Sequence, residues 1–160
     1  MDDGSSDGSM EIVKGIKDSR IRLFSQKNQG VSAARNAGIR QAVGQYIALL
    51  DADDRWEPSY LKEQYDLIQK YPQCGVFAVN YSYVYSSGAK VPNRVNHLDF
   101  CGMDGILKDY FRVAAFSQPP VCSSAVVIRK DCLESVGGFP VGITSGEDLI
   151  TWARLAYRYE

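Results

Sequence analysis

The chain has 160 residues, of which 45% are hydrophobic and 23% charged, and its net charge is −1. This composition predicts one soluble globular domain with its own core, and the near-neutral charge excludes a protein that binds nucleic acid or anionic membrane through a general positive field. No apolar stretch approaches the roughly 20 residues of a membrane-spanning helix, and the polar, acidic start excludes a signal peptide.

The first 26 residues begin with turn chemistry. "DDGSSDGS" combines Asp, Gly and Ser, which tolerate left-handed backbone and bond to nearby backbone groups. We expect a short helix over residues 10–17. A strand is predicted over residues 20–26, where apolar and basic side chains alternate.

A helix and a buried strand follow. "NQGVSAARNAGIRQAVG" predicts a helix that Ser32 caps and Gly44 ends, with a face of small residues that would let it lie close to a sheet. "YIALL", residues 46–50, is apolar on both sides of the pleat. This is typical of a central strand that is covered on both faces.

The remaining chain alternates helices and strands. The helices are predicted over residues 59–70, 105–112, 130–138 and 146–159, and the strands over 74–85 and 123–129, with a loop over 86–102. Such alternation predicts an α/β fold with a largely parallel sheet. The four cysteines form no C-x-x-C pair, so we expect four reduced, mostly buried thiols in a cytoplasmic protein.

Three carboxylates, Asp51, Asp53 and Asp54, follow the strand over residues 46–50. Ligands in open α/β sheets bind outside the carboxyl ends of the strands, and Mg²⁺ takes one or two carboxylates plus phosphate oxygens. Asp51 and Asp53 share one side if the extended geometry persists. We therefore expect a divalent cation and a diphosphate to meet here. A solvated turn that begins the next helix stays open as an alternative, above all for Asp54.

Several motifs stand in one order along the chain: "DDGSSDGS", "NQGVSAARNAGI", "GQYIALLDADDRWEP", "GGFP" and "GEDLITWARL". Together they resemble glycosyltransferase family 2. The resemblance implies the GT-A fold, a mixed and mostly parallel sheet flanked by helices, in a single catalytic domain over residues 1–160. It also implies a metal-dependent, inverting transfer of a sugar from a nucleotide-diphospho-sugar, with a UDP-sugar favoured, and Mn²⁺ or Mg²⁺ as the cation.

The resemblance also implies roles for single residues. Asp3 would lie near the nucleobase, Arg35 in the nucleotide pocket and Asp51 near the ribose. Asp53 would hold the metal. Asp148, in "GED", would be the catalytic base that takes a proton from the acceptor hydroxyl. An arginine on a helix surface and an acid that begins a helix are the structural alternatives for Arg35 and Asp148.

The chain also departs from the family pattern. The strand that usually precedes the first acidic motif is absent, as is the region beyond the last helix, so we expect a fragment truncated at both ends. The acceptor would be a saccharide or a lipid-linked saccharide in surface or exopolysaccharide synthesis. The expected location is the cytoplasm, with the inner face of the membrane as an option for the full-length protein. No nucleic acid partner is expected, and the oligomeric state stays open.

Two other functions remain open. A truncated fold could bind a nucleotide-sugar or a metal without catalysis, and the missing strand favours this reading. A phosphotransferase of the haloacid-dehalogenase type also places D-x-D after an apolar strand, with Asp51 as nucleophile and Asp53 as acid. That family continues with Gly-Thr or Gly-Val, whereas this chain continues with Asp54-Arg55-Trp56.

Overall fold

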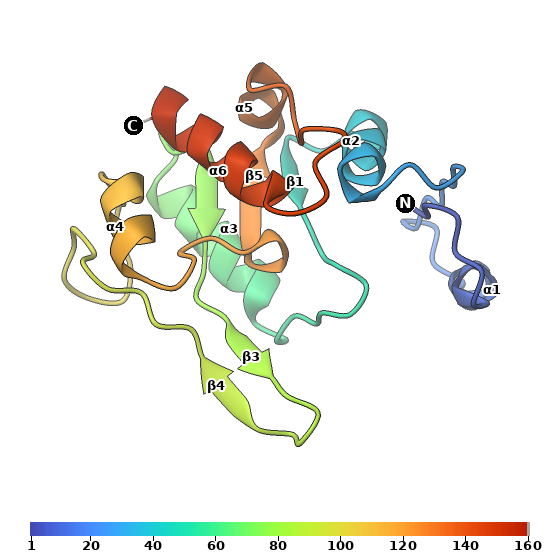
Figure 1. Cartoon of the computed structure of the whole chain (residues 1–160), viewed down its shortest axis with the longest axis horizontal. Coiled ribbons are helices and arrows are strands. Elements are labelled where there is room, and N and C mark those ends of the chain that lie inside the picture. Colours follow the sequence, from blue (N-terminus) through green and yellow to red (C-terminus); the bar gives the residue numbers. More distant parts are fainter. Residues whose placement is uncertain (160) are drawn as a thin grey trace.

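In the computed structural model, which describes residues 1–159, three short strands form the central sheet (Figure 1). They are β1 (Tyr46–Ala48), β2 (Val76–Ala78) and β5 (Val126–Arg129), and their order across the sheet is β1-β5-β2. A separate hairpin pairs β3 (Ser82–Val84) with β4 (Lys90–Pro92).

Helices cover both faces of the central sheet. The helices within residues 1–159 are α1 (Ser9–Gly15), which lies away from the sheet, and α2 (Val31–Gln41), α3 (Tyr60–Lys70), α4 (Tyr110–Phe116), α5 (Lys130–Ser135) and α6 (Glu147–Arg158). In Figure 1, α3 lies behind the sheet, whereas α6 crosses in front of it. None of the described helices is long and apolar enough to cross a membrane.

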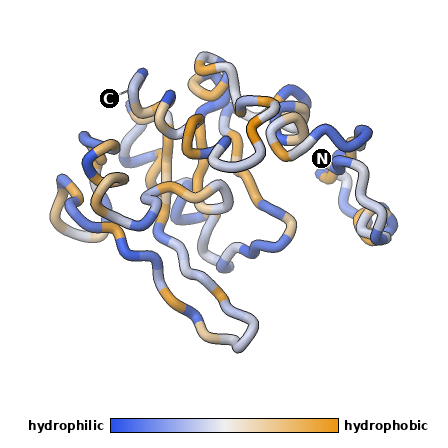
Figure 2. The backbone as a smooth tube through the Cα atoms, viewed as in Figure 1, coloured by the Kyte–Doolittle hydropathy of each residue, from blue (hydrophilic) through white to orange (hydrophobic). Residues whose placement is uncertain are grey.

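Alternation along β5 divides the core in two. Val126 and Ile128, both fully buried, pack with residues of α2, α5 and α6, whereas Val127 packs with Tyr60 of α3 and Phe77 of β2. This is the two-residue period of a strand that is buried on both faces. Figure 2 shows the hydrophobic segments concentrated in these central strands. The sheet therefore provides a rigid base whose strand ends carry the acidic loop.

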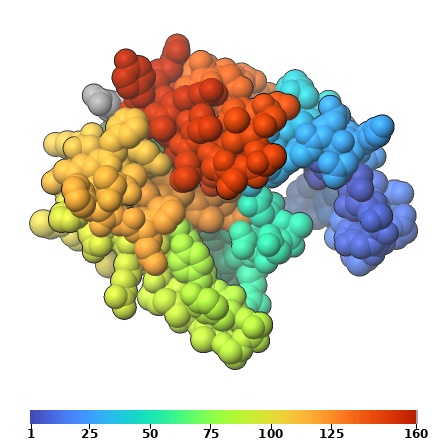
Figure 3. Space-filling view, in the orientation of Figure 1, coloured from blue at the N-terminus to red at the C-terminus, as the bar shows by residue number. Residues whose placement is uncertain are grey.

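The N-terminal part stands apart from this core. α1 buries none of its residues, and the chain around it projects from one side of the molecule (Figures 1 and 3). A single parallel bridge between Asp2 and Ser25 closes this segment. The strand predicted over residues 20–26 is wrong, because local alternation cannot make a strand without a neighbouring strand to pair with, and Ile21 is 42% exposed.

The α/β class is confirmed, but the expected parallel sheet is wrong for the described strands. β1 and β2, joined through α3, run in the same direction, and β5 lies between them antiparallel to both. β1 is also an edge strand, not the central strand that its apolar sequence suggested. Its Ala48 is exposed.

Other boundaries differ for identifiable reasons. The strand predicted over residues 74–85 splits into β2 and β3, and the predicted loop over 86–102 contains β4, the partner of β3. The helix predicted over residues 105–112 begins only at Tyr110, because Asp109 caps it by accepting the N–H of Arg112. The helices predicted over 59–70 and 146–159 are confirmed as α3 and α6. The helix over 130–138 is confirmed as α5 but ends at Ser135, and the strand over 123–129 is confirmed as β5 only from Val126, because residues 123–125 form a 3₁₀ turn.

α2 begins after Gly30, so Ser32 lies inside the helix, 3% exposed, and is not its cap. The helix ends at Gln41 and not at Gly44. All four cysteines are free, as expected. Only Cys132 is buried, which corrects the expectation that most of the thiols are.

Candidate functional site

The acidic loop after β1 is a turn and not an extension of the strand. The N–H of Asp54 donates to the carbonyl oxygen of Asp51 at 3.1 Å. The alternation argument that placed Asp51 and Asp53 on one side is therefore wrong. A short 3₁₀ turn, Ser123–Ala125, anchors the loop: Ser124 Oγ accepts the N–H of Asp51 at 3.0 Å, and its carbonyl oxygen accepts Nε1–H of Trp56 at 2.7 Å.

Arg35, in α2, joins the acidic loop to the start of α6. Its Nη2 donates to both carboxylate oxygens of Asp51, at 2.8 and 2.9 Å, and its Nη1 donates to Oε1 of Glu147 at 3.0 Å. The side chains of Arg35 and Glu147 are each 12% exposed and that of Asp51 is 38% exposed. Two predicted site residues, Arg35 and Asp51, are thus in direct contact. Glu147 is a partner that the sequence did not indicate.

The "GGFP" segment packs against the guanidinium of Arg35. The guanidinium carbon of Arg35 lies 5.1 Å from the centroid of the Phe139 ring. Asn36 holds this segment to α2 by accepting the N–H of Phe139 at 2.8 Å and donating to its carbonyl oxygen at 2.7 Å. Gly138 has a φ of +66°, and a Cβ there would lie 2.5 Å from Oδ1 of Asn36. Only glycine allows this close approach.

Asp148 is partly buried at the start of α6, where its carboxylate accepts the N–H of Leu149 at 2.8 Å. Burial raises the pKa of Tyr81, and a bond to Tyr83 and the negative charge of Asp148 raise it further. Burial and then the Asp148 charge also raise the pKa of Tyr110. Asp148 therefore lies within electrostatic range of two tyrosines on the side of the molecule that carries the hairpin.

The Cys122 thiol is affected by the charges of both acidic motifs. Burial raises the pKa of this thiol, the backbone N–H of Ser124 lowers it, and the charges of three carboxylates raise it again. These carboxylates are, in order of effect, Asp54, Asp51 and Asp148. The charges of the acidic loop and of the "GED" acid thus act on the same thiol, although the two motifs lie about 100 residues apart in the chain.

Asp3 anchors the loop that precedes α2. Its carboxylate accepts from Nε2 of Gln26 at 2.7 Å and from the N–H groups of Gly30 and Gln29 at 2.8 and 3.0 Å. The bond to Gln26 and then the two backbone bonds lower the pKa of Asp3 against the opposing effect of burial. These three donors fix Asp3 beside the N-terminus of α2. Its role at the nucleobase stays a prediction.

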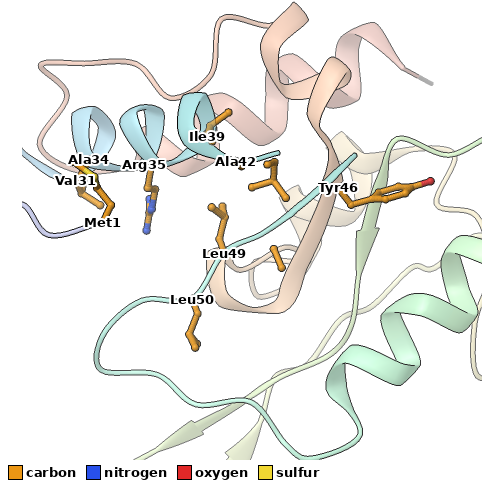
Figure 4. A pocket seen from close by; sticks show the side chains of 12 residues that line it. Met1, Val31, Ala34, Arg35, Ile39, Ala42, Tyr46, Leu49 and Leu50 are labelled. Carbon is orange, nitrogen blue, oxygen red and sulfur yellow. The ribbon is translucent and has the colours of Figure 1, made fainter. Parts of the chain in front are cut away.

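A mostly apolar cavity of about 380 Å³ lies between α2 and β1 (Figure 4). Arg35 lines it and points from α2 toward the chain that leaves β1, beside Met1, Val31 and Leu50. None of the predicted site acids lines this cavity. The cavity and the predicted acids therefore do not coincide.

Within residues 1–159 no group of three or more His, Cys, Asp or Glu side chains is arranged to hold a metal ion. Asp53 is exposed, and among these residues its carboxylate takes part in no hydrogen bond or ion pair. A single available carboxylate fits a cation that takes most of its ligands from phosphate oxygens and water, as Mg²⁺ commonly does. The assignment of Asp53 to the metal stays a prediction.

The sequence missed several contributors to the site: Glu147, Asn36, Ser124 and Phe139. Glu147 could have been noticed as the second acid of "GED", since two successive acids are more than a helix start requires. The others carry no signal in their spacing. Their importance arises from contacts between segments that lie 68 to 112 residues apart.

The chain is similar to proteins that are named as glycosyltransferases. The profile of "Glycosyl transferase family 2" matches residues 1–137. A glycosyltransferase of Rickettsia felis is 29% identical over 98% of the chain, and TuaG of Bacillus subtilis, named for teichuronic acid biosynthesis, is 29% identical over 97%. The cholesterol galactosyltransferase of Borreliella burgdorferi is 46% identical over 41% of the chain.

These relatives differ in how much of their length the chain covers. It spans 24% of the Rickettsia felis protein, 58% of TuaG and 19% of the Borreliella burgdorferi protein. The family profile nevertheless covers most of the chain, and it includes the segments that carry Asp3, Arg35, Asp51 and Asp53. The chain therefore belongs to glycosyltransferase family 2, which implies the GT-A fold.

Proposed function

We propose that the protein transfers a sugar, with inversion, from a nucleotide-diphospho-sugar to the hydroxyl of a saccharide or lipid-linked saccharide. The observation that carries this is the Arg35 contact, which joins the D-x-D loop to the helix that begins with Glu147 and Asp148. Donor and acceptor motifs that are distant in sequence thus meet at one place. A UDP-sugar is the favoured donor, and the name of TuaG supports a role in surface polysaccharide synthesis.

The proposed reaction is a single displacement. Asp148 accepts the proton of the acceptor hydroxyl, and the oxygen attacks the anomeric carbon from the face opposite the diphosphate. One carboxylate is enough because the diphosphate is already a good leaving group, whereas a glycosidase also needs a general acid. Tyr81 and Tyr110, whose pKa values the charge of Asp148 raises, are the candidates for contact with the acceptor.

A divalent cation, Mn²⁺ or Mg²⁺, fits the donor end. Asp53 would hold it, and the cation would supply neutralisation of the charge that develops on the diphosphate, an effect worth several kcal/mol. Arg35 is already shared between two carboxylates, so together these three side chains carry one negative charge. This surplus charge disfavours a bare diphosphate and favours one that arrives with a cation.

A thermal-shift screen of nucleotide-sugars, with and without Mn²⁺, tests the function as a whole. A ligand that binds the folded protein raises its melting temperature by an amount that grows with the logarithm of ligand concentration over Kd. We expect stabilisation by at least one nucleotide-sugar only when Mn²⁺ is present. Absence of any stabilisation across UDP-, GDP- and CDP-sugars contradicts the proposal.

Asp53→Asn is expected to weaken Mn²⁺-dependent UDP binding far more than Asp54→Asn does. Both side chains are exposed, so neither substitution disturbs the core. Asp53 is the second aspartate of the D-x-D motif, whereas Asp54 lies outside it. Asp54 donates its backbone N–H to the turn, and an Asn at this position keeps that N–H. Calorimetry of UDP binding with Mn²⁺ measures the difference. Equal losses remove the special status of Asp53.

Asp51 is expected to form no phosphoryl adduct. Both of its carboxylate oxygens accept hydrogen bonds from Nη2 of Arg35, which lowers their nucleophilicity. Incubation with acetyl phosphate and Mg²⁺, followed by mass spectrometry of the intact chain and its peptides, checks this. A phosphoryl group on Asp51 would move the protein to the phosphotransferase class.

A further inference from the structure

Glu147 is buried in a way that the start of a helix does not require. An acid in a first turn is favoured by the helix dipole and is normally solvated, as Glu63 is in the first turn of α3, where it is exposed. The side chain of Glu147 is only 12% exposed and faces Arg35. Burial of a carboxylate costs desolvation energy, which the bond to Arg35 offsets. The burial of Glu147 against Arg35 indicates that Glu147 acts through its bond to Arg35.

Arg35 links the position of the Glu147 carboxylate to that of the Asp51 carboxylate. A guanidinium is a rigid planar fork, so fixing Nη1 also fixes the direction of Nη2. Glu147 fixes Nη1 at 3.0 Å, and Nη2 then contacts both oxygens of Asp51. The ring of Phe139, below the guanidinium, limits the remaining tilt. Without Glu147, Arg35 would be held at one end only.

We propose that Glu147 is a positioning residue of the donor site, which acts through Arg35 to orient the carboxylate of Asp51 for the nucleotide. The inference rests on the proposed function, in which Asp51 belongs to the nucleotide site. The two successive acids of "GED" then serve opposite ends of the reaction. Glu147 faces Arg35 of α2 and the donor site, whereas Asp148 acts on the acceptor in the proposed reaction.

Nucleotide binding to the chain provides the first test. UDP with Mn²⁺ is titrated by calorimetry, with GDP and CDP in parallel, into the parent protein and into Glu147→Gln, Glu147→Asp and the matched control Glu63→Gln. Glu147→Gln is expected to weaken binding by about 10-fold, within the range of coupling between contacting residues. Glu147→Asp keeps the charge and recovers part of the loss, and Glu63→Gln binds as the parent does.

A double-mutant cycle separates positioning from a general loss of structure. In the Asp51→Asn background, Glu147→Gln should change the affinity by less than about 2-fold, because the group on which it acts is gone. A merely structural role for Glu147 gives the same 10-fold loss in both backgrounds. That additive result overturns the proposal, as does parent-like affinity of Glu147→Gln for every nucleotide that binds.

A measurement without ligand keeps the inference independent of the donor. The rate at which the side-chain N–H protons of Arg35 exchange with water can be measured by ¹⁵N NMR. We expect this rate to be low in the parent and at least 10-fold higher in Glu147→Gln. Unchanged exchange overturns the positioning of Arg35 by Glu147. If none of the nucleotides binds the parent, the proposed function fails, and the exchange rates still decide whether Glu147 fixes Arg35.

Discussion

The Asp148→Asn variant is expected to transfer sugar at least ~100-fold more slowly than the parent, because general base catalysis is worth ~10²–10⁴-fold. Asn is nearly isosteric with Asp, so the packing of Trp152 and Leu155 on the same helix, each 2% exposed, stays intact. Donor binding should be unchanged, since Asp148 lies on the acceptor side. The transfer rate of the full-length protein, with the donor found in the nucleotide-sugar screen, and the affinity for UDP and Mn²⁺ are the two measurements.

Asp131→Asn is the matched control for this prediction. Asp131 is the second residue of α5, as Asp148 is of α6, and each carboxylate accepts the N–H of the following residue at 2.8 Å. Asn keeps an oxygen that accepts this N–H at both positions, and Asp131→Asn also removes the ion pair with Arg129, but only Asp148→Asn removes the proposed base. Similar transfer rates for the two variants, or a loss of donor binding in Asp148→Asn, would assign Asp148 to a helix cap or a donor ligand.

The helices were easier to predict from the sequence than the strands. α3, α5 and α6 were predicted because a helix is specified by contacts within a few residues: the Tyr60–Lys70 segment follows Pro58, and Trp152 and Leu155 share one face. Strands depend on partners elsewhere in the chain. Residues 20–26 alternate correctly and still form no strand, because only Ser25 meets a partner, Asp2.

The site was predicted only where a motif carried the information. The resemblance predicted that Arg35, Asp51 and Asp148 belong to one site. In the structure, Arg35 contacts Asp51. The contact between Arg35 of α2 and Glu147 of α6 spans 112 positions and results from the tertiary fold. No periodicity in the sequence encodes such a contact. The turn at Asp51 was only the alternative to an extended strand, because "DADD" continues an apolar strand without glycine or proline.

Phe139 connects the core to this site, so its loss should have the largest effect on stability. Its side chain is 1% exposed and meets the ring of Trp152 edge to face, with centroids 5.8 Å apart. Replacing a buried Phe by Ala loses the transfer energy of the ring and leaves a cavity, which together cost about 3–5 kcal/mol. We therefore expect Phe139→Ala to lower the free energy of unfolding by about that amount, a large part of the 5–15 kcal/mol typical of a domain.

Phe116→Ala is the control, because it removes the same atoms from α4, where the ring is 66% exposed. Its expected cost is below about 1 kcal/mol, since little apolar surface is returned to water. Urea unfolding of both variants gives the two free energies. Equal losses would mean that the contacts of Phe139 with Trp152 and Arg35 contribute little beyond ordinary surface packing. A selective loss in Phe139→Ala would show that the ring supporting Arg35 belongs to the core, so that the orientation of Arg35 depends on the stability of the fold itself.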